Sequence, residues 1–411
     1  MRTRDPARRE ARFTRPLPEG ETERWLRLPA LQQPRWENPE RAGECRRLLT
    51  GLRGLVTGSE VRRLQEVLAR CALGKLHVVQ VGDCAEDPDE SDPQAVRRTV
   101  GLIDALAGVW QMSTGTPAVR VGRMAGQYAK PRSRPVEKVG GRTLPVYRGH
   151  MVNRPGPHEA DRRHLPDHML HCYEAAARVV GELTRLGDQA QPAVWTSHEA
   201  LVLDYELSLI RCDTAGRRLL TSTHWPWIGD RTRDPAHAHV RLLASVVNPV
   251  ACKVGPTATP EEVLELCAAL DPARQPGRLT LISRMGAEAV DERLPPLVEA
   301  VRAAGHPVIW LCDPMHANTR RIHGIKTRHL REITAELRRF HHCVSAAGGI
   351  PGGVHLETTA ADVAECTDGD TDPVCRPGGY QSLCDPRLNP RQALAVLTAV
   401  RDTVPGPAPE R

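Results

Sequence analysis

Short apolar runs alternate with amphipathic segments along most of this chain. The runs are four to six residues long, as in buried strands, and the segments between them repeat apolar residues at helical spacing. We predict strands at residues 76–81, 118–121, 193–196, 219–223, 250–254, 279–282, 308–311 and 353–356. We predict helices at residues 60–72, 93–110, 166–186, 200–210, 236–246, 295–304, 328–340, 361–366 and 390–401, and one more that begins at Thr259 and Pro260.

Strands that alternate with helices and end in polar residues are typical of a (β/α)8 TIM barrel, an α/β fold. A doubly wound open sheet is the alternative, but no strand here leads into a G-x-G-x-x-G or Walker A motif. We assign residues 49–405 to the barrel domain, including a long loop at residues 131–166. Residues 1–48 mix prolines and tryptophans without a clear period, which predicts a partly irregular N-terminal arm.

Composition narrows the class of protein. The net charge of +6 reflects a bias toward arginine, and no basic run is interleaved with aromatic residues, so nucleic-acid binding is not expected. No stretch is long enough for a membrane span. The twelve cysteines are scattered without a C-x-x-C pair or a preceding signal segment, and Asp5 and Glu10 argue against a transit peptide. These features predict a cytoplasmic protein with reduced thiols.

The polar residues after the predicted strands form two chemically different sets. One set offers a thiol, imidazoles and carboxylates, which together suit a divalent transition metal: Cys84, His316, His355, Glu357 and Asp385. The other set is cationic and suits phosphate and carboxylate groups: Arg123, Lys130, Arg132, Arg231, Lys253 and Arg284. In a barrel these strand ends meet at one mouth, so the two sets are predicted to share a site.

Cys384 precedes Asp385 directly in the sequence. If Asp385 meets Cys84 at a metal, the two sulfurs come within disulfide range when the metal is absent. This link is a hypothesis, and an unpaired Cys384 is the alternative.

Ten motifs in order give the chain a family resemblance. GDCAED, GRMAGQYAKPRS, YRGHMVN, WTSHEALVLDYE, WIGDRTR, NPVACKVGPTATPEE, GRLTLISRMGAE, GHPVIWLCDPMHANT, GGIPGGVHLETTA and CDPRLNPRQAL resemble the motif series of the class II (plant-type) 3-deoxy-D-arabino-heptulosonate 7-phosphate (DAHP) synthases. The resemblance runs from about residue 25 to residue 401. It implies a metal-dependent barrel enzyme of the shikimate pathway that condenses phosphoenolpyruvate with erythrose 4-phosphate, and that forms dimers or larger homo-oligomers.

The resemblance also implies roles for individual residues. The metal ligands fall on Cys84, His316, Glu357 and Asp385, which leaves His355 as a neighbour, and the metal is expected to be Mn²⁺, with Co²⁺, Fe²⁺ or Zn²⁺ as alternatives. Phosphoenolpyruvate contacts match Arg123, Arg231, Lys253 and Arg284, and Asp230 lies beside them. Aldose phosphate contacts match Lys130, Arg132 and Ser133. Lys253 is expected to relay a proton.

Two motifs depart from the family pattern. The family has WIGERTR where this chain has Asp230, and YRGDNVN where it has His150 and Met151. The departures, together with an N-terminal region that is short relative to primary-metabolism members, leave three interpretations open. The chain is a DAHP synthase, including one dedicated to secondary metabolism; a variant synthase that uses another aldehyde, such as an imino sugar phosphate; or a catalytically silent regulatory homologue.

Overall fold

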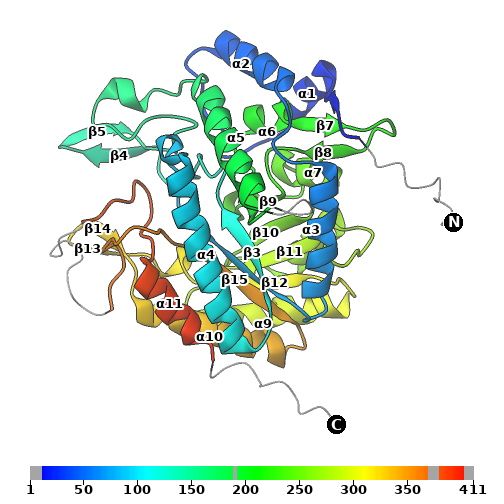
Figure 1. Cartoon of the computed structure of the whole chain (residues 1–411), viewed down its shortest axis with the longest axis vertical. Helices are drawn as coiled ribbons and strands as arrows, with labels where there is room; N and C mark the ends of the chain where they lie inside the picture. Colours follow the sequence, from blue (N-terminus) through cyan, green and yellow to red (C-terminus); the bar gives the residue numbers. More distant parts are fainter. Residues whose placement is uncertain (1–11, 188–191, 369–378, 402–411) are drawn as a thin grey trace.

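The fold is a closed barrel of eight parallel strands. The computed structural model describes residues 12–187, 192–368 and 379–401. The barrel closes because β15 pairs with β2 in parallel register. Figure 1 shows the whole chain, with β15, β3 and β10 among the strands at its centre. The barrel strands in chain order are β2 (His77–Gly82), β3 (Ala118–Arg123), β6 (Trp195–Glu199), β9 (Trp225–Ile228), β10 (Val250–Val254), β11 (Leu279–Ser283), β12 (Ile309–Cys312) and β15 (Pro351–Glu357). The predicted TIM barrel is confirmed.

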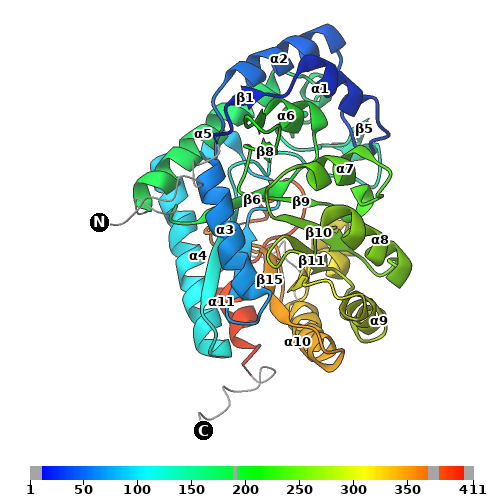
Figure 2. The same cartoon turned by 90° about the vertical axis from the view of Figure 1, so that its right-hand side faces the viewer.

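Helices surround the barrel on its outer side (Figure 2). They bury one face of each strand while the barrel interior buries the other, which explains why the strands read as continuous apolar runs. The helices that follow barrel strands are α4 (Pro93–Thr114), α5 (His168–Leu186), α6 (Leu203–Ser208), α7 (Ala238–Ser245), α8 (Pro260–Leu270), α9 (Val290–Ala303), α10 (Leu330–Ala346) and α11 (Pro390–Thr398). Helix α8 begins at the predicted signal, since Thr259 and Glu262 form a capping box.

Helix α3 (Gly58–Cys71) closes the amino-terminal end of the barrel. Its Leu64 and Leu68 belong to the same buried cluster as Val78 and Ile309 in the barrel interior. A Cβ atom on Gly277, just before β11, would lie 2.4 Å from the backbone nitrogen of Ala69. This end is therefore filled with apolar side chains, and the polar strand ends gather at the opposite mouth.

The prediction for the fourth strand is wrong. Residues 218–220 form β8 (Arg218–Leu220), which pairs with β7 (Ile210–Cys212) beside β1 (Arg15–Pro16), and the barrel strand is β9. Pro226 inside β9 has no backbone N–H, so the sequence argued against a strand there. The predicted helix at residues 200–210 is shortened to α6 because β7 begins at Ile210.

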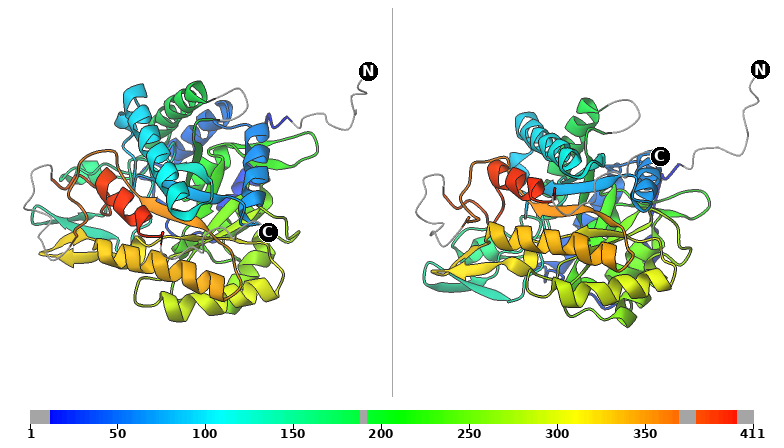
Figure 3. Two further views of the ribbon diagram at one scale, coloured as in Figure 1. Left: turned by 60° about the horizontal axis from the view of Figure 1, so that its bottom comes forward. Right: turned by 90° about the horizontal axis from the view of Figure 1, so that it is seen from below.

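Four other segments also differ from the predictions. The N-terminal segment carries α1 (Glu19–Leu26) and α2 (Pro39–Gly51), and the Asn38 side chain caps α2. The segment predicted as a loop contains a hairpin of β4 (Val136–Val139) and β5 (Arg142–Pro145), whose turn uses Gly140 and Gly141 at positive φ. A second hairpin, β13 (Arg320–Ile322) with β14 (Ile325–Thr327), follows β12. Residues 361–366 form no helix, and α11 lies beside α4 and α10 (Figure 3).

Within the described ranges, no helix combines the length and the apolar character that a membrane span requires.

Candidate active site

The polar strand ends surround a cavity of about 210 Å³. Most residues of the two predicted sets line it, whereas Cys84, Arg123, His355 and Glu357 are buried and are not among its lining residues. The lining includes Lys130, Arg132, Ser133, Glu199, Asp230, Arg231, Lys253, Arg284, His316, Lys326 and Asp385.

The four predicted metal ligands lie together around one cation. Donor atoms of Cys84, Glu357 and Asp385 lie within 4.8 Å of one another, and His316 Nε2 is 3.1 Å from Glu357 Oε1. The ammonium of Lys130 lies among them: Nζ is 2.9 Å from Cys84 Sγ, 2.6 Å from Glu357 Oε1, 3.3 Å from Asp385 Oδ2 and 3.4 Å from His316 Nε2. One thiol, one imidazole and two carboxylates therefore already surround a positive charge.

Electrostatics agree with this geometry. Burial by itself would lower the pKa of Lys130, but Cys84, Glu357 and Asp385 raise it well above its usual value. Burial would likewise raise the pKa of Glu357, but His316, Lys130 and Arg328 hold it well below the usual range. The Lys130 ammonium and the Glu357 carboxylate are therefore both charged at neutral pH.

A surrounding layer of side chains fixes the four donors. Asp313 Oδ2 lies 2.7 Å from His316 Nδ1, an arrangement that leaves Nε2 facing the cation. Arg328 is fully buried and donates to Glu357 Oε2 at 2.7 Å. Lys326 on β14 donates to Asp385 Oδ1 at 2.6 Å. Sequence reasoning missed Arg328 and Lys326, because the role of each depends on a contact with a residue far along the chain.

His355 is not part of the donor cluster. Its Nε2 lies 2.7 Å from Arg123 Nη1 and its Nδ1 lies 2.7 Å from Gln80 Oε1. Arg123 in turn donates to Glu357 Oε1 at 3.1 Å and lies over the Trp227 ring. His355 therefore positions Arg123.

The cationic set occupies the wall beside the donor cluster. Lys253 Nζ donates to Asp313 Oδ2 at 2.8 Å, and burial lowers the pKa of Lys253 although Asp313 opposes this. Arg284 donates to Asp230 Oδ2 at 2.7 Å, and Arg231 donates to Ser133 Oγ at 2.7 Å. Five cations of this set, together with Lys326 and the Ser133 hydroxyl, thus line one small cavity.

The comparison with protein families shows which family the chain belongs to. The model of the class-II DAHP synthetase family matches residues 20–190 and 182–400. The chain belongs to this family. A probable phospho-2-dehydro-3-deoxyheptonate aldolase of Pseudomonas fluorescens is 50% identical over 383 residues, covering 92% of this chain and 96% of its own length.

More distant relatives agree. Phospho-2-dehydro-3-deoxyheptonate aldolases of Mycolicibacterium smegmatis and Streptomyces coelicolor are each 36% identical over 92% of this chain, with 93% and 96% of their own lengths covered. Among solved structures, a phospho-2-dehydro-3-deoxyheptonate aldolase from Francisella tularensis shares the fold with a TM-score of 0.56, at 14% identity, over 92% of this chain and 98% of that one.

Glu199 is a polar residue of this class-II DAHP synthetase to which the sequence analysis gave no role. It is the last residue of β6, is only 8% exposed and lines the cavity. Its Oε1 has no hydrogen-bond partner among the described residues. Burial raises the pKa of Glu199, although Lys253 and Lys130 oppose this. The glutamate in WTSHE directly after a predicted strand was the available signal.

The residues that depart from the family pattern, Asp230, His150 and Met151, lie in different surroundings. Asp230 lines the cavity and accepts from the Gly255 backbone N–H at 3.0 Å as well as from Arg284. A Cβ on Gly255 would lie 2.7 Å from Asp230 Oδ2, so the shorter side chain is closely packed. His150 Nδ1 is hydrogen-bonded to Tyr147 Oη at 2.8 Å, and Met151 is buried in the core. Neither residue lines the cavity.

Cys384 lies beside the donor cluster. Arg132 donates to its sulfur at 3.4 Å, and the Asp385 backbone N–H donates to Cys84 Sγ at 3.3 Å. A hydrogen bond to Cys84 lowers the pKa of the Cys384 thiol, and Arg132 lowers it further. The two cysteines are in contact, but the structure contains no disulfide between them. The predicted link therefore stays a hypothesis.

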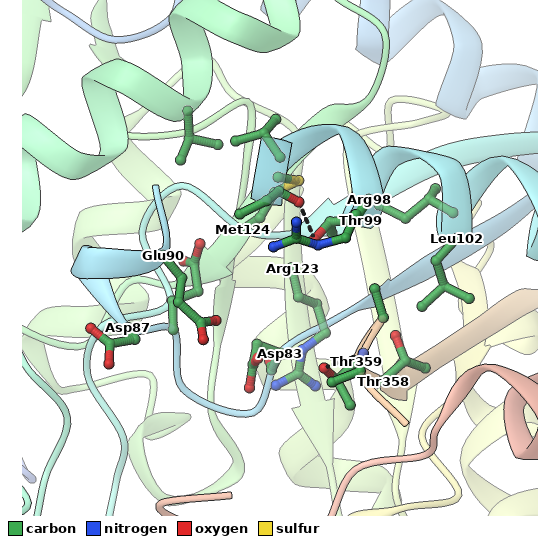
Figure 4. A pocket seen from close by; sticks show the side chains of 17 residues that line it. Asp83, Asp87, Glu90, Arg98, Thr99, Leu102, Arg123, Met124, Thr358 and Thr359 are labelled. Carbon is green, nitrogen blue, oxygen red and sulfur yellow. Dashed lines mark hydrogen bonds between the residues drawn. The ribbon is translucent and has the colours of Figure 1, made fainter. Parts of the chain in front are cut away.

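A second cavity of about 280 Å³ lies next to Arg123 (Figure 4). Two of its carboxylates have structural partners: Arg387 donates to Asp83 Oδ2 at 2.8 Å, and Glu86 accepts three backbone N–H groups from residues 125–127. These bonds tie the loop after β2 to the segment after β15 and to the loop after β3. We assign this cavity no role in the chemistry.

Proposed function

We propose that this chain condenses phosphoenolpyruvate with erythrose 4-phosphate and water to give DAHP and phosphate, using a divalent metal. The observation that carries the proposal is the arrangement of Cys84, His316, Glu357 and Asp385 around the Lys130 ammonium, next to a cationic wall. Membership of the class-II DAHP synthetase family and the full-length relatives support it.

The donor set fits a divalent metal. A thiolate, an imidazole and two carboxylates are ligands that Mn²⁺, Co²⁺, Fe²⁺ and Zn²⁺ all accept, and we favour Mn²⁺. When bound, such a metal would act as a Lewis acid toward the aldehyde carbonyl. Asp313, Arg328 and Lys326 would hold the ligands in place through the contacts already described.

The wall residues are suited to the two phosphorylated substrates. Arg123, Arg231, Lys253 and Arg284 supply the charges for the phosphate and carboxylate of phosphoenolpyruvate. Arg132 and Ser133, with Lys130 on the same turn, are suited to the phosphate of the aldose. Because Arg231 donates a hydrogen bond to Ser133, the two phosphate positions are adjacent. Positioning of the two substrates in this way supplies much of the rate gain.

The reaction needs one proton donor and one proton acceptor from the protein. C3 of phosphoenolpyruvate bonds to the aldehyde carbon, whose oxygen takes a proton, and Lys253 is suited to provide it. Water then adds to C2 and gives one proton to the protein. When the bond between C2 and the phosphate oxygen breaks, the leaving phosphate takes the second proton of that water and C2 becomes the keto carbon. Glu199, a buried carboxylate with an oxygen that has no partner among the described residues, is suited to accept the first proton.

The test is phosphoenolpyruvate consumption, followed by its ultraviolet absorbance, with purified protein, Mn²⁺ and erythrose 4-phosphate. We expect activity that a chelator removes, that Mn²⁺ restores, and that Cys84→Ser abolishes. Cys343→Ser on α10, away from the donor cluster, is the matched control and should remain active. Metal-loaded protein that leaves phosphoenolpyruvate unchanged would contradict the proposal.

The other interpretations have less support. His150 and Met151 lie outside the cavity lining, so only Asp230 bears on a different aldehyde. All four metal ligands and all four phosphoenolpyruvate cations are retained, which disfavours a silent homologue. A homo-oligomer in the cytoplasm remains our prediction for the assembly and the compartment.

A further inference from the structure

A second cationic hollow lies on the outer side of the turn that carries Arg132 and Ser133. It measures about 740 Å³ and is bounded by the N-terminal segment, the β4–β5 hairpin and residues 162–164. Six arginines line it, against a single carboxylate, Glu37. The feature is separate from the substrate cavity, with which it shares only Arg132 and Ser133.

Some of these arginines already have counter-ions. Glu137 accepts from Arg162 at 2.5 Å and from Arg132 at 3.3 Å. Arg163 is paired with Glu37 at 2.5 Å. Both carboxylates close to the hollow are therefore in use.

The other arginines lack an acidic partner within the part of the chain that the structure describes. Arg148 donates to the backbone and side-chain oxygens of Gln32, which are neutral, and its buried Nε has no partner there. The side chains of Arg35 and Arg134 are exposed and make no ion pair with a described residue. The hollow thus holds three positive charges that no carboxylate among the described residues balances.

These charges act on one another. Burial lowers the pKa of Arg148, and the nearby Arg132 lowers it further. Burial also lowers the pKa of His164, and Arg148 and Arg35 add to the effect. Like charges held this close are destabilising unless an anion joins them. Arg148, which has no acidic partner among the described residues, is therefore suited to bind an anion.

We propose that this hollow is a binding site for a phosphate dianion, free or as part of a small phosphate ester. The guanidinium groups of Arg148 and Arg35 offer paired donors that match phosphate oxygens, and the volume has room for an attached small molecule. This assignment does not depend on the proposed reaction.

The site is connected to the substrate turn through Gln32. Gln32 accepts from Arg148 Nη2, and its Oε1 also accepts from the Arg132 backbone N–H at 2.9 Å. A phosphate that draws Arg148 toward itself competes with Gln32 for the same guanidinium. Occupancy of the hollow therefore acts on the turn that carries Arg132 and Ser133.

The test is equilibrium dialysis of the full, Mn²⁺-loaded chain with radiolabelled inorganic phosphate. Arg284→Gln provides the background, because it removes a cation from the substrate cavity and its side-chain partner Asp230 does not line the hollow. In that background we expect one phosphate per chain. Arg148→Gln should weaken its binding at least about tenfold, and Arg148→Lys should restore much of it.

Controls separate binding from folding. Arg35 makes no side-chain hydrogen bond to a described residue, so Arg35→Gln should keep the thermal unfolding temperature and still weaken phosphate binding several-fold. Arg70→Gln, an exposed arginine on α3 at the opposite end of the barrel, should change nothing. Displacement by glycerol 3-phosphate would assign the site to esters, and its failure would assign it to free phosphate. Unchanged binding in both Arg148→Gln and Arg35→Gln would overturn the proposal.

Discussion

Asp313 connects the two functional halves of the site, so its replacement by asparagine tests the whole arrangement. One carboxylate oxygen lies 2.7 Å from His316 Nδ1 and 2.8 Å from Lys253 Nζ. The residue is fully buried, which makes the loss of its charge costly. Removing one partner of a buried ion pair typically costs roughly 3–5 kcal/mol, and removing a carboxylate that orients a metal-binding histidine weakens metal binding about 10–100-fold.

We expect Asp313→Asn to weaken Mn²⁺ binding by about that factor and to lower kcat more than KM changes. Lys253 would lose the partner that opposes its low pKa, so the alkaline limb of the pH–rate profile should move to lower pH. Metal binding is measured by competition with a fluorescent chelator, and kcat by phosphoenolpyruvate consumption. Asp213→Asn, a buried aspartate paired with Arg217 outside the site, is the matched control. An unchanged Mn²⁺ affinity together with an unmoved alkaline limb would refute the reasoning.

Three further predictions follow from single contacts. Glu199→Gln should lower kcat at least about 100-fold with little change in KM or in melting temperature, because the side chain keeps its shape and loses only its ability to accept a proton; a normal kcat would exclude it as a base. Protein from which a chelator has removed the metal should stay folded, because the Lys130 ammonium balances the charge of the donor side chains. Without metal, Lys130→Met should have a lower melting temperature than Lys75→Met, in which the replaced lysine is exposed. Equal melting temperatures of the two variants would contradict this. Burial lowers the pKa of His77 to about 4 and that of His224 to about 3. Their contribution to the free energy of unfolding is therefore complete above pH 6.5 and is lost as the pH falls, by about 2 kcal/mol for each at pH 5. In urea unfolding, His77→Gln should lose less free energy of unfolding between pH 7 and pH 5 than the parent chain.

The barrel could be predicted because its strands are buried on both faces and therefore appear as apolar runs. The barrel strand β9 is the exception. β9 is WPWI, in which Pro226 removes a backbone donor, while Leu219 and Leu220 before it pair with β7 outside the barrel. The predicted helix at residues 361–366 fails for a tertiary reason, since the Glu365 carboxylate accepts backbone N–H groups of Gln381, Ser382 and Arg387.

The site could be predicted only as far as the strand ends. Asp385 lies after the last strand and was found by motif, but the lysine that holds it lies 59 residues away on a hairpin that the apolar pattern does not reveal. Lys326 nevertheless left one signal, because the chain has only five lysines and it is the third of them to lie at this mouth. Arg328 left none, as arginine is common throughout the sequence.

The position of Lys130 explains how one turn can serve both halves of the site. Its ammonium balances the four donors in the structure, yet Lys130 belongs to the same turn as Arg132 and Ser133, the residues suited to the aldose phosphate. A divalent metal held by these donors would repel the Lys130 ammonium at such distances. The metal would also balance the donor charges that now attract the ammonium. The lysine would then be available to an anion on the cavity side. We therefore expect metal loading and recognition of the phosphorylated aldehyde to be linked through the charge of this side chain.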